Sequence, residues 1–165
     1  MEFLSASEQD TIKFGQNLAG LLMESDIICL SGELGAGKTR LVKGIAKGLG
    51  INPDIVRSPT FVLMNIYEGK LPLYHFDFYR MDGIDGVDLI GYDEFFYGEG
   101  VSVIEWPQRL ENSLPAESLN IEIVHKGKDS RMIRVIADGA RYERILTCMR
   151  KKKTDFFFHA VRRQT

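Results

Sequence analysis

A short glycine-rich segment constrains the fold of this chain more than any other feature. It follows an apolar, β-branched run at residues 27–31, which is typical of a buried strand. Helical periodicity begins directly after it, and we expect a helix over residues 38–49 that stops at Gly50. A strand, a tight turn and a helix in this order predict an α/β protein with a phosphate-binding loop. The segment fits the pattern GxxxxGK(S/T) and consists of Gly32, Glu33, Leu34, Gly35, Ala36, Gly37, Lys38 and Thr39.

The chemistry of phosphate binding explains the residue types in this segment. Glycines allow successive backbone N–H groups to turn inward around phosphate oxygens without an obstructing side chain. The amino end of the following helix adds unpaired N–H groups and the positive end of the helix dipole. Lys38 is a flexible cation for the β- and γ-phosphates, and Thr39 offers a hydroxyl to Mg²⁺. The motif predicts a nucleoside triphosphate with magnesium and does not distinguish ATP from GTP.

A site of this kind needs a carboxylate near the metal ion, and the chain offers two candidates. Glu105 ends the apolar run 101–104, where the end of a strand should lie. Asp77 stands among aromatic residues inside an expected strand, where a carboxylate is costly unless a cation or donors compensate it. Either acid could contact Mg²⁺ while the other orients the attacking water. The structural alternative is an ion pair, for instance between Asp77 and Arg80, so the sequence leaves both roles open.

The rest of the chain predicts a P-loop NTPase-like mixed sheet with helices on both faces and antiparallel hairpin additions. We expect an amphipathic helix over 7–23 with Ser7 as its N-cap, a helix over 85–97 and a terminal helix over 141–149. Strands are expected at 61–67, 73–79, 101–105, 119–125 and 131–137, with the first two and the last two forming hairpins. We assign residues 1–149 to a single P-loop ATPase domain and residues 150–165 to a basic, Phe-containing C-terminal extension.

Composition limits where such a protein works. Its 165 residues are 44% hydrophobic and 27% charged, as in globular proteins, and no apolar run approaches the ~20 residues that cross a bilayer. No basic region followed by an apolar stretch opens the chain, so we expect a cytoplasmic protein without membrane contact. Two cysteines without CxxC spacing and three scattered histidines argue against a transition-metal site. Twelve basic against four acidic residues at 126–165 indicate a solvated basic face, or a contact with an acidic partner or RNA.

Four sequence blocks together resemble the TsaE (YjeE) family. They are the glycine-rich segment, residues 58–61 (SPTF), residues 74–80 (YHFDFYR) and residues 104–107 (IEWP), in the family's order and at about its spacing. The resemblance implies a Mg²⁺-dependent ATPase, slow on its own and stimulated by its partners TsaB and TsaD. Those partners transfer a threonylcarbamoyl group to an adenosine of ANN-decoding tRNAs. ATP hydrolysis would reset their complex between turnovers, so that the family member meets tRNA only through that complex.

The resemblance also implies roles for individual residues. Lys38 and Thr39 match the phosphate and metal positions, Asp77 an acid that is catalytic or linked to the metal, and Glu105 an acid associated with magnesium. The remaining matches are Trp106 beside the site, Ser58 and Thr60 in a switch-like loop near the γ-phosphate, and Glu8 and Arg131 near the adenosine.

Three other functions fit parts of the sequence. A small-molecule P-loop kinase would share the glycine-rich segment, but the chain has no obvious arginine-rich lid or acceptor pocket. A binding module with a degraded site conflicts with the intact set of Lys38, Thr39, Asp77 and Glu105. An RNA-stimulated ATPase would use the basic C-terminal part. We expect instead a switch in which ATP orders residues 57–60 and 82–93 and so creates the partner surface.

Overall fold

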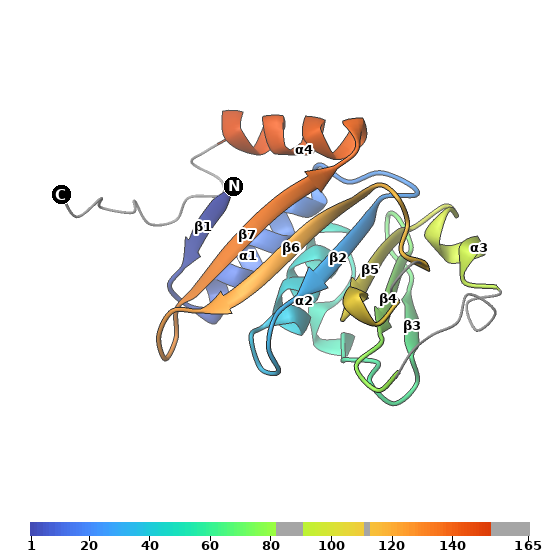
Figure 1. Cartoon of the computed structure of the whole chain (residues 1–165), viewed down its shortest axis with the longest axis horizontal. Helices are drawn as coiled ribbons and strands as arrows, with labels where there is room; N and C mark the ends of the chain where they lie inside the picture. Colours follow the sequence, from blue (N-terminus) through green and yellow to red (C-terminus); the bar gives the residue numbers. More distant parts are fainter. Residues whose placement is uncertain (82–90, 111–112, 153–165) are drawn as a thin grey trace.

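A seven-stranded mixed sheet forms the centre of the molecule (Figure 1). The computed structural model describes residues 1–81, 91–110 and 113–152. The strand order is β1-β7-β6-β2-β5-β4-β3, in which β2 is parallel to both of its neighbours and β4 is parallel to β5. The other three pairs are antiparallel. The strands are β1 (Glu2–Ser5), β2 (Ile27–Ser31), β3 (Met64–Tyr67), β4 (Leu73–Asp77), β5 (Val101–Glu105), β6 (Ser118–His125) and β7 (Arg131–Asp138).

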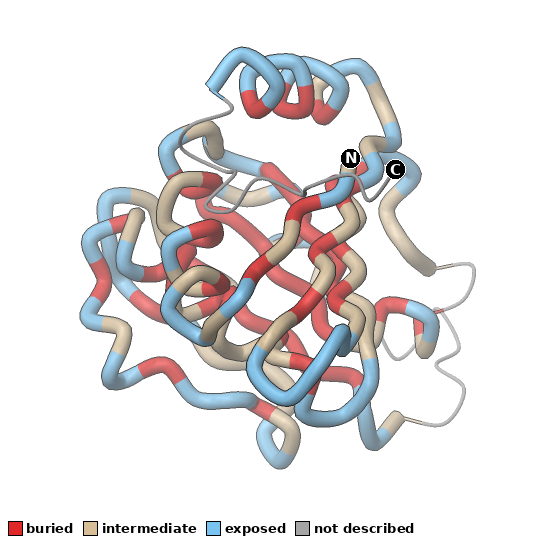
Figure 2. The backbone as a smooth tube through the Cα atoms, turned by 90° about the vertical axis from the view of Figure 1, so that its left-hand side faces the viewer, coloured by how far each residue is buried: buried red, intermediate tan, exposed pale blue. Residues whose placement is uncertain are grey.

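Helices lie on both faces of the sheet, which agrees with the expected α/β architecture, but on one face the described residues form only a four-residue α-helix. The α-helices are α1 (Glu8–Ala19), α2 (Lys38–Gly48), α3 (Asp93–Phe96) and α4 (Ala140–Lys151). One face of β2 presents Ile28 and Leu30 to the core formed with α1 and α2. The other face presents Ile27 and Cys29 to a smaller core that includes Phe96 of α3. Because alternate strand residues point to opposite faces, the apolar residues 27–30 of this strand are buried from both sides. Figure 2 shows buried backbone running through the centre of the molecule, with exposed segments around it.

Most of the expected elements are present, with shifted ends. Ser7 caps α1 because its hydroxyl accepts a hydrogen bond from the Asp10 N–H at 3.1 Å, and both hairpins are present. The strand expected from residue 61 starts at Met64, because the N–H groups of Val62 and Leu63 donate to the Pro59 carbonyl in a turn. α1 ends before the predicted residue 23, and α4 continues to Lys151.

One further expectation lies partly outside the described residues, and one observed strand was not expected. Of the helix expected at 85–97, residues 85–90 lie outside the described residues, and the described remainder is helical only at Asp93–Phe96. Strand β1 was not predicted, because its four residues acquire their hydrogen-bond partners only from β7. In the part of the chain that the structure describes, no helix combines the length and apolarity needed to cross a membrane.

Glycine contacts set the distance between α1 and α2, the helix that follows the glycine-rich segment. A Cβ atom added at Gly44 of α2 would lie 2.1 Å from the Ile12 carbonyl oxygen of α1. One added at Gly15 of α1 would lie 2.4 Å from the Leu41 carbonyl oxygen of α2. The two helix backbones therefore touch where these glycines face each other, and larger residues would push α2 off the sheet.

We predict that Gly44→Ala destabilises the protein by about 2 kcal/mol or more, because the added methyl group overpacks this contact. Gly20→Ala is the matched control: Gly20 has φ −68° and its added Cβ would find no foreign atom closer than 3.5 Å. The control should change stability by less than about 0.5 kcal/mol. Urea unfolding measures both variants, and equal stability of the two would contradict the close helix contact.

Candidate functional site

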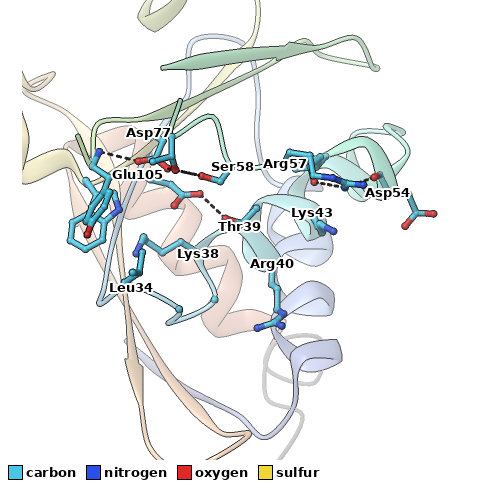
Figure 3. Close-up of a pocket in the computed structure, with 16 residues that line it drawn as sticks. Leu34, Lys38, Thr39, Arg40, Lys43, Asp54, Arg57, Ser58, Asp77 and Glu105 are labelled. Carbon is cyan, nitrogen blue, oxygen red and sulfur yellow. Dashed lines mark hydrogen bonds between the residues drawn. The ribbon is translucent and has the colours of Figure 1, made fainter. Parts of the chain in front are cut away.

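The candidate site lies where three parallel strands end beside the glycine-rich segment. In the register of the sheet, Leu30 of β2 is opposite Glu105 of β5, which is opposite Asp77 of β4. The chain passes from the end of β2 through residues 32–37 into α2. Because the carboxyl ends of parallel strands share one edge of the sheet, both acids stand next to this loop. Figure 3 shows Asp77 and Glu105 facing Lys38 and Thr39 across the pocket.

The loop backbone has the conformation that its glycines permit. Gly32 has φ 144°, and a Cβ atom there would lie 2.5 Å from the Ile123 carbonyl oxygen. Gly37 has φ 111° and occupies the N-cap of α2, where it provides no side-chain hydrogen bond. The first N–H groups of α2 therefore gain no acceptor from their cap residue. This is the arrangement in which a helix amino end binds an anion.

The Lys38 ammonium group is held inside the loop. Its Nζ atom donates to the carbonyl oxygens of Gly32 at 2.8 Å and Glu33 at 3.0 Å. The same atom lies 4.2 Å from the centroid of the Trp106 ring, a cation–π contact. Burial lowers the pKa of Lys38, and the negative charges of Glu105 and Asp77 oppose that effect. An anionic ligand at this position would favour the protonated lysine.

Trp106, which stacks on this lysine, has an unusual backbone. Its φ of 60° and ψ of 48° place it in the left-handed region, which is costly for a bulky residue. Its N–H donates to the Leu30 carbonyl oxygen at 3.1 Å, and its ring centroid lies 4.9 Å from that of Tyr79. The turn after β5 is thereby fixed against β2, and the indole ring lies over the lysine.

Glu105 is the centre of a buried polar cluster. Its side chain is almost completely removed from solvent, and its Oε1 atom accepts two hydrogen bonds. The Thr39 hydroxyl donates to it at 3.3 Å, and His75 Nε2 lies 2.9 Å from the same oxygen. Thr39 and Glu105, predicted as metal ligands, are therefore adjacent in space although 66 residues separate them in sequence.

Asp77 is surrounded by donors from the loop that precedes β3. Its Oδ2 atom accepts from the hydroxyls of Ser58 at 2.6 Å and Thr60 at 2.5 Å, and its Oδ1 atom accepts from the Tyr79 N–H at 3.0 Å. These hydrogen bonds compensate its buried charge. The alternative partner, Arg80, has its guanidinium group 4.1 Å from the centroid of the Phe61 ring. The structure therefore favours donor groups, not an ion pair with Arg80, as the partners of Asp77.

These groups line a cavity of about 760 Å³. Its predicted lining residues are Leu34, Gly35, Gly37, Lys38, Thr39, Ser58, Thr60, Asp77, Glu105 and Trp106. Arg57, from the expected switch segment 57–60, also lines it. Sequence reasoning did not assign a site role to five others, which are Arg40, Lys43, Asp54, Val56 and Tyr79. Lys43 could have been found, because residues four apart on a helix share a face and Thr39 is a site residue. Asp54 and Val56 carry no local signal.

Five predicted residues lie outside this lining. Gly32 and Glu33 act through the carbonyl groups that hold Lys38, and the Ala36 carbonyl accepts a hydrogen bond from Arg131 Nε at 3.3 Å. Arg131 is buried and also donates to the Lys128 carbonyl oxygen at 3.2 Å, so it supports the loop from behind.

Glu8, the fifth of these residues, forms an ion pair with Arg40, which does line the cavity. The adenosine contacts expected of Glu8 and Arg131 stay predictions.

The donor atoms of the site suit magnesium. Mg²⁺ prefers oxygen ligands and keeps several of its waters, relying on one or two carboxylates together with substrate phosphates. The Thr39 hydroxyl and the Glu105 carboxylate are such oxygens, and both line the cavity. Within the described residues, no group of three or more histidine, cysteine, aspartate or glutamate side chains is arranged to hold a metal ion by itself.

Comparison with known proteins assigns the family. The family model described as "Threonylcarbamoyl adenosine biosynthesis protein TsaE" matches residues 5–133. The chain belongs to the TsaE family. The relative of that name from Bacillus subtilis is 42% identical over 144 residues, which cover 87% of this chain and 89% of the relative. The Treponema pallidum TsaE is 43% identical over 141 residues, covering 86% and 96% of the two chains.

A solved structure agrees with this assignment to the TsaE family. The crystal structure of YdiB from Bacillus subtilis superposes with a TM-score of 0.81 at 37% sequence identity. The superposition covers 93% of this chain and 95% of YdiB. The matched family region contains the glycine-rich segment, both acids and Trp106, so the whole candidate site lies within the part that defines the TsaE family.

We predict that Asp77→Ala loosens the loop at residues 58–63, because the Ser58 and Thr60 hydroxyls lose their shared acceptor. Hydrogen exchange at the Val62 and Leu63 amides, which donate to the Pro59 carbonyl, should become about tenfold faster. Asp129→Ala, at an exposed residue of the β6–β7 turn, removes the same charge and should leave these amides unchanged. Equal exchange rates in the two variants would contradict this role of Asp77.

Proposed function

We propose that this TsaE-family protein is a Mg²⁺-dependent ATPase that works with TsaB and TsaD in the biosynthesis of threonylcarbamoyladenosine in tRNA. The observation that carries the proposal is the hydrogen bond between the Thr39 hydroxyl and the Glu105 carboxylate, next to the glycine-rich loop. Lys38 and Asp77 line the same cavity, so cationic, hydroxyl and carboxylate groups converge on the place where the terminal phosphates would lie. Family membership supports the biosynthetic role. The two protein partners are those that the resemblance to the TsaE family implies.

Binding of the triphosphate begins with Lys38. Its ammonium group is bonded to the carbonyl oxygens of Gly32 and Glu33. Phosphate oxygens are stronger acceptors than neutral carbonyl groups, because hydrogen bonds between charged groups are about twice as strong. Lys38 therefore moves toward the β- and γ-phosphates, and the first N–H groups of α2 complete the cradle. The cavity is large enough to hold a nucleotide.

Thr39 and Glu105 would together hold the magnesium ion. The Thr39 hydroxyl would give a lone pair to the metal, and Glu105 would act directly or through a bound water. A magnesium ion held there would supply positive charge against the negative charge that develops on the phosphates during transfer. Asp77 is the second acid. When the γ-phosphate attracts the Thr60 hydroxyl, one hydrogen-bond position on Asp77 Oδ2 would open for the attacking water, while the Ser58 hydroxyl keeps the other.

The loop that contains Ser58 and Thr60 connects the nucleotide to the partner proteins. It leads directly into Phe61 and Val62, whose side chains are 82% and 66% exposed. A contact between Thr60 and the γ-phosphate would move these apolar side chains together with the loop. TsaB and TsaD would then meet a different surface before and after hydrolysis, as a nucleotide switch requires.

We predict that Lys38→Ala weakens MgATP binding about 100-fold, because the buried cation that contacts two phosphates is lost. Lys47→Ala is the matched control, since Lys47 lies on the same helix, carries the same charge, is exposed and does not line the cavity. It should change the affinity less than about twofold. Calorimetric titration with ATP and with GTP measures both variants. Equal affinity of the two variants for ATP would refute the proposed nucleotide site.

A further inference from the structure

His75 is a buried polar residue for which packing alone gives no reason. It lies in the middle of β4, between Asn65 of β3 and Val103 of β5 in the register of the sheet, and it is fully buried. Within the described residues, its Nδ1 atom has no hydrogen-bond partner. A buried polar atom without a partner costs stability, which an apolar residue at this position would avoid. The benefit of a histidine must therefore come from its other nitrogen.

That nitrogen, Nε2, lies 2.9 Å from Glu105 Oε1. His75 and Glu105 sit on the same face of the sheet, because His75 is two residues before Asp77, the register partner of Glu105. An ionised carboxylate only accepts hydrogen bonds, so Nε2 carries the hydrogen and donates it. The ring extends from the middle of a paired strand, which gives this donor a fixed position.

The two donors to Glu105 Oε1 differ in how firmly they are held. The Thr39 hydroxyl is a magnesium ligand in the proposed function. It would give a lone pair to the metal, and its hydrogen can rotate toward Glu105 or away from it. His75 Nε2 has no second task, and its bond can persist whatever the Thr39 hydroxyl does. The Oε1 atom would thus stay anchored on β4, and the other oxygen of the same carboxylate would be available to the metal or to a water bound to it.

We propose that His75 is a positioning residue for the magnesium site, which holds the Glu105 carboxylate in the orientation that the metal requires. This inference rests on the proposed function, in which Glu105 holds the magnesium ion directly or through a water. Outer partners of metal ligands typically contribute 10- to 100-fold to metal affinity by such orientation. His75 itself touches neither nucleotide nor metal, and its effect is confined to the contribution that Mg²⁺ makes to ATP binding.

Two amide substitutions test this arrangement. In His75→Gln the side-chain nitrogen can occupy the place of Nε2 and donate to Glu105. In His75→Asn, which is one methylene shorter, the amide reaches only as far as Nδ1. Both variants keep a polar side chain in the buried position, so they share the general cost of replacing the imidazole. They differ in whether the donor reaches Glu105.

The measurement is calorimetric titration of ATP in excess Mg²⁺ and in EDTA, expressed for each protein as the ratio of the two dissociation constants. Both dissociation constants are measured on the same variant, so their ratio does not depend on how much of that protein is folded. Unfolded protein lowers the binding stoichiometry instead. We expect Mg²⁺ to strengthen binding by the wild type, His75→Gln to stay within about threefold of the wild-type ratio, and His75→Asn to lose about tenfold of it. Affinity in EDTA should be similar for all three proteins.

Each failure has its own meaning. If the wild type shows a Mg²⁺ effect and the Asn variant keeps it in full, or if the Gln and Asn variants lose it equally, His75 does not position Glu105 and the inference is overturned. If ATP binding by the wild type is absent or indifferent to Mg²⁺, the proposed function fails, and the inference fails with it.

Discussion

The parallel pairing of β2 with β5, and of β5 with β4, is the constraint on which the rest of the site depends. It aligns Leu30, Glu105 and Asp77 across three neighbouring strands, so both acids lie at the edge where the glycine-rich loop begins. Burial of β2 from both faces fixes this register, because a slip by one residue would exchange the residues that meet its two cores. The position of Glu105 beside Thr39 is therefore a property of the sheet, not of a flexible loop.

A closed set of polar contacts follows from this alignment. Lys38 is buried near two acids, Glu105 is bonded by Thr39 and His75, and Asp77 is bonded by Ser58 and Thr60. Each of these groups has a hydrogen-bond partner in the structure. A nucleotide would replace the carbonyl acceptors of Lys38 by phosphate oxygens, while the hydrogen bond from His75 holds Glu105 in place. The glycine-rich loop and the ends of β4 and β5 would thus need little backbone rearrangement to bind the ligand, unlike the loop with Ser58 and Thr60.

The sequence predicts the parts of this protein that short-range patterns encode. The glycine-rich loop, β2 and α2 follow from a contiguous motif, and Glu105 follows from its place at the end of an apolar run. Strand β1 could not be found in this way, because its hydrogen bonds come from β7 at the other end of the chain. The hydrogen bond between His75 and Glu105 also depends on the register between strands that are far apart in sequence. The sequence alone therefore does not distinguish His75 from the other two histidines.

The most direct test of the account is steady-state ATP hydrolysis by the protein alone and with the TsaB–TsaD complex, with Glu105→Gln as the blank. The substitution keeps the size of the side chain and removes the charge that the account assigns to magnesium. We predict a low rate for the protein alone, a rise of about tenfold or more with the complex, and the loss of most of this rate in the variant. A rate that responds neither to the complex nor to Glu105→Gln would contradict the account.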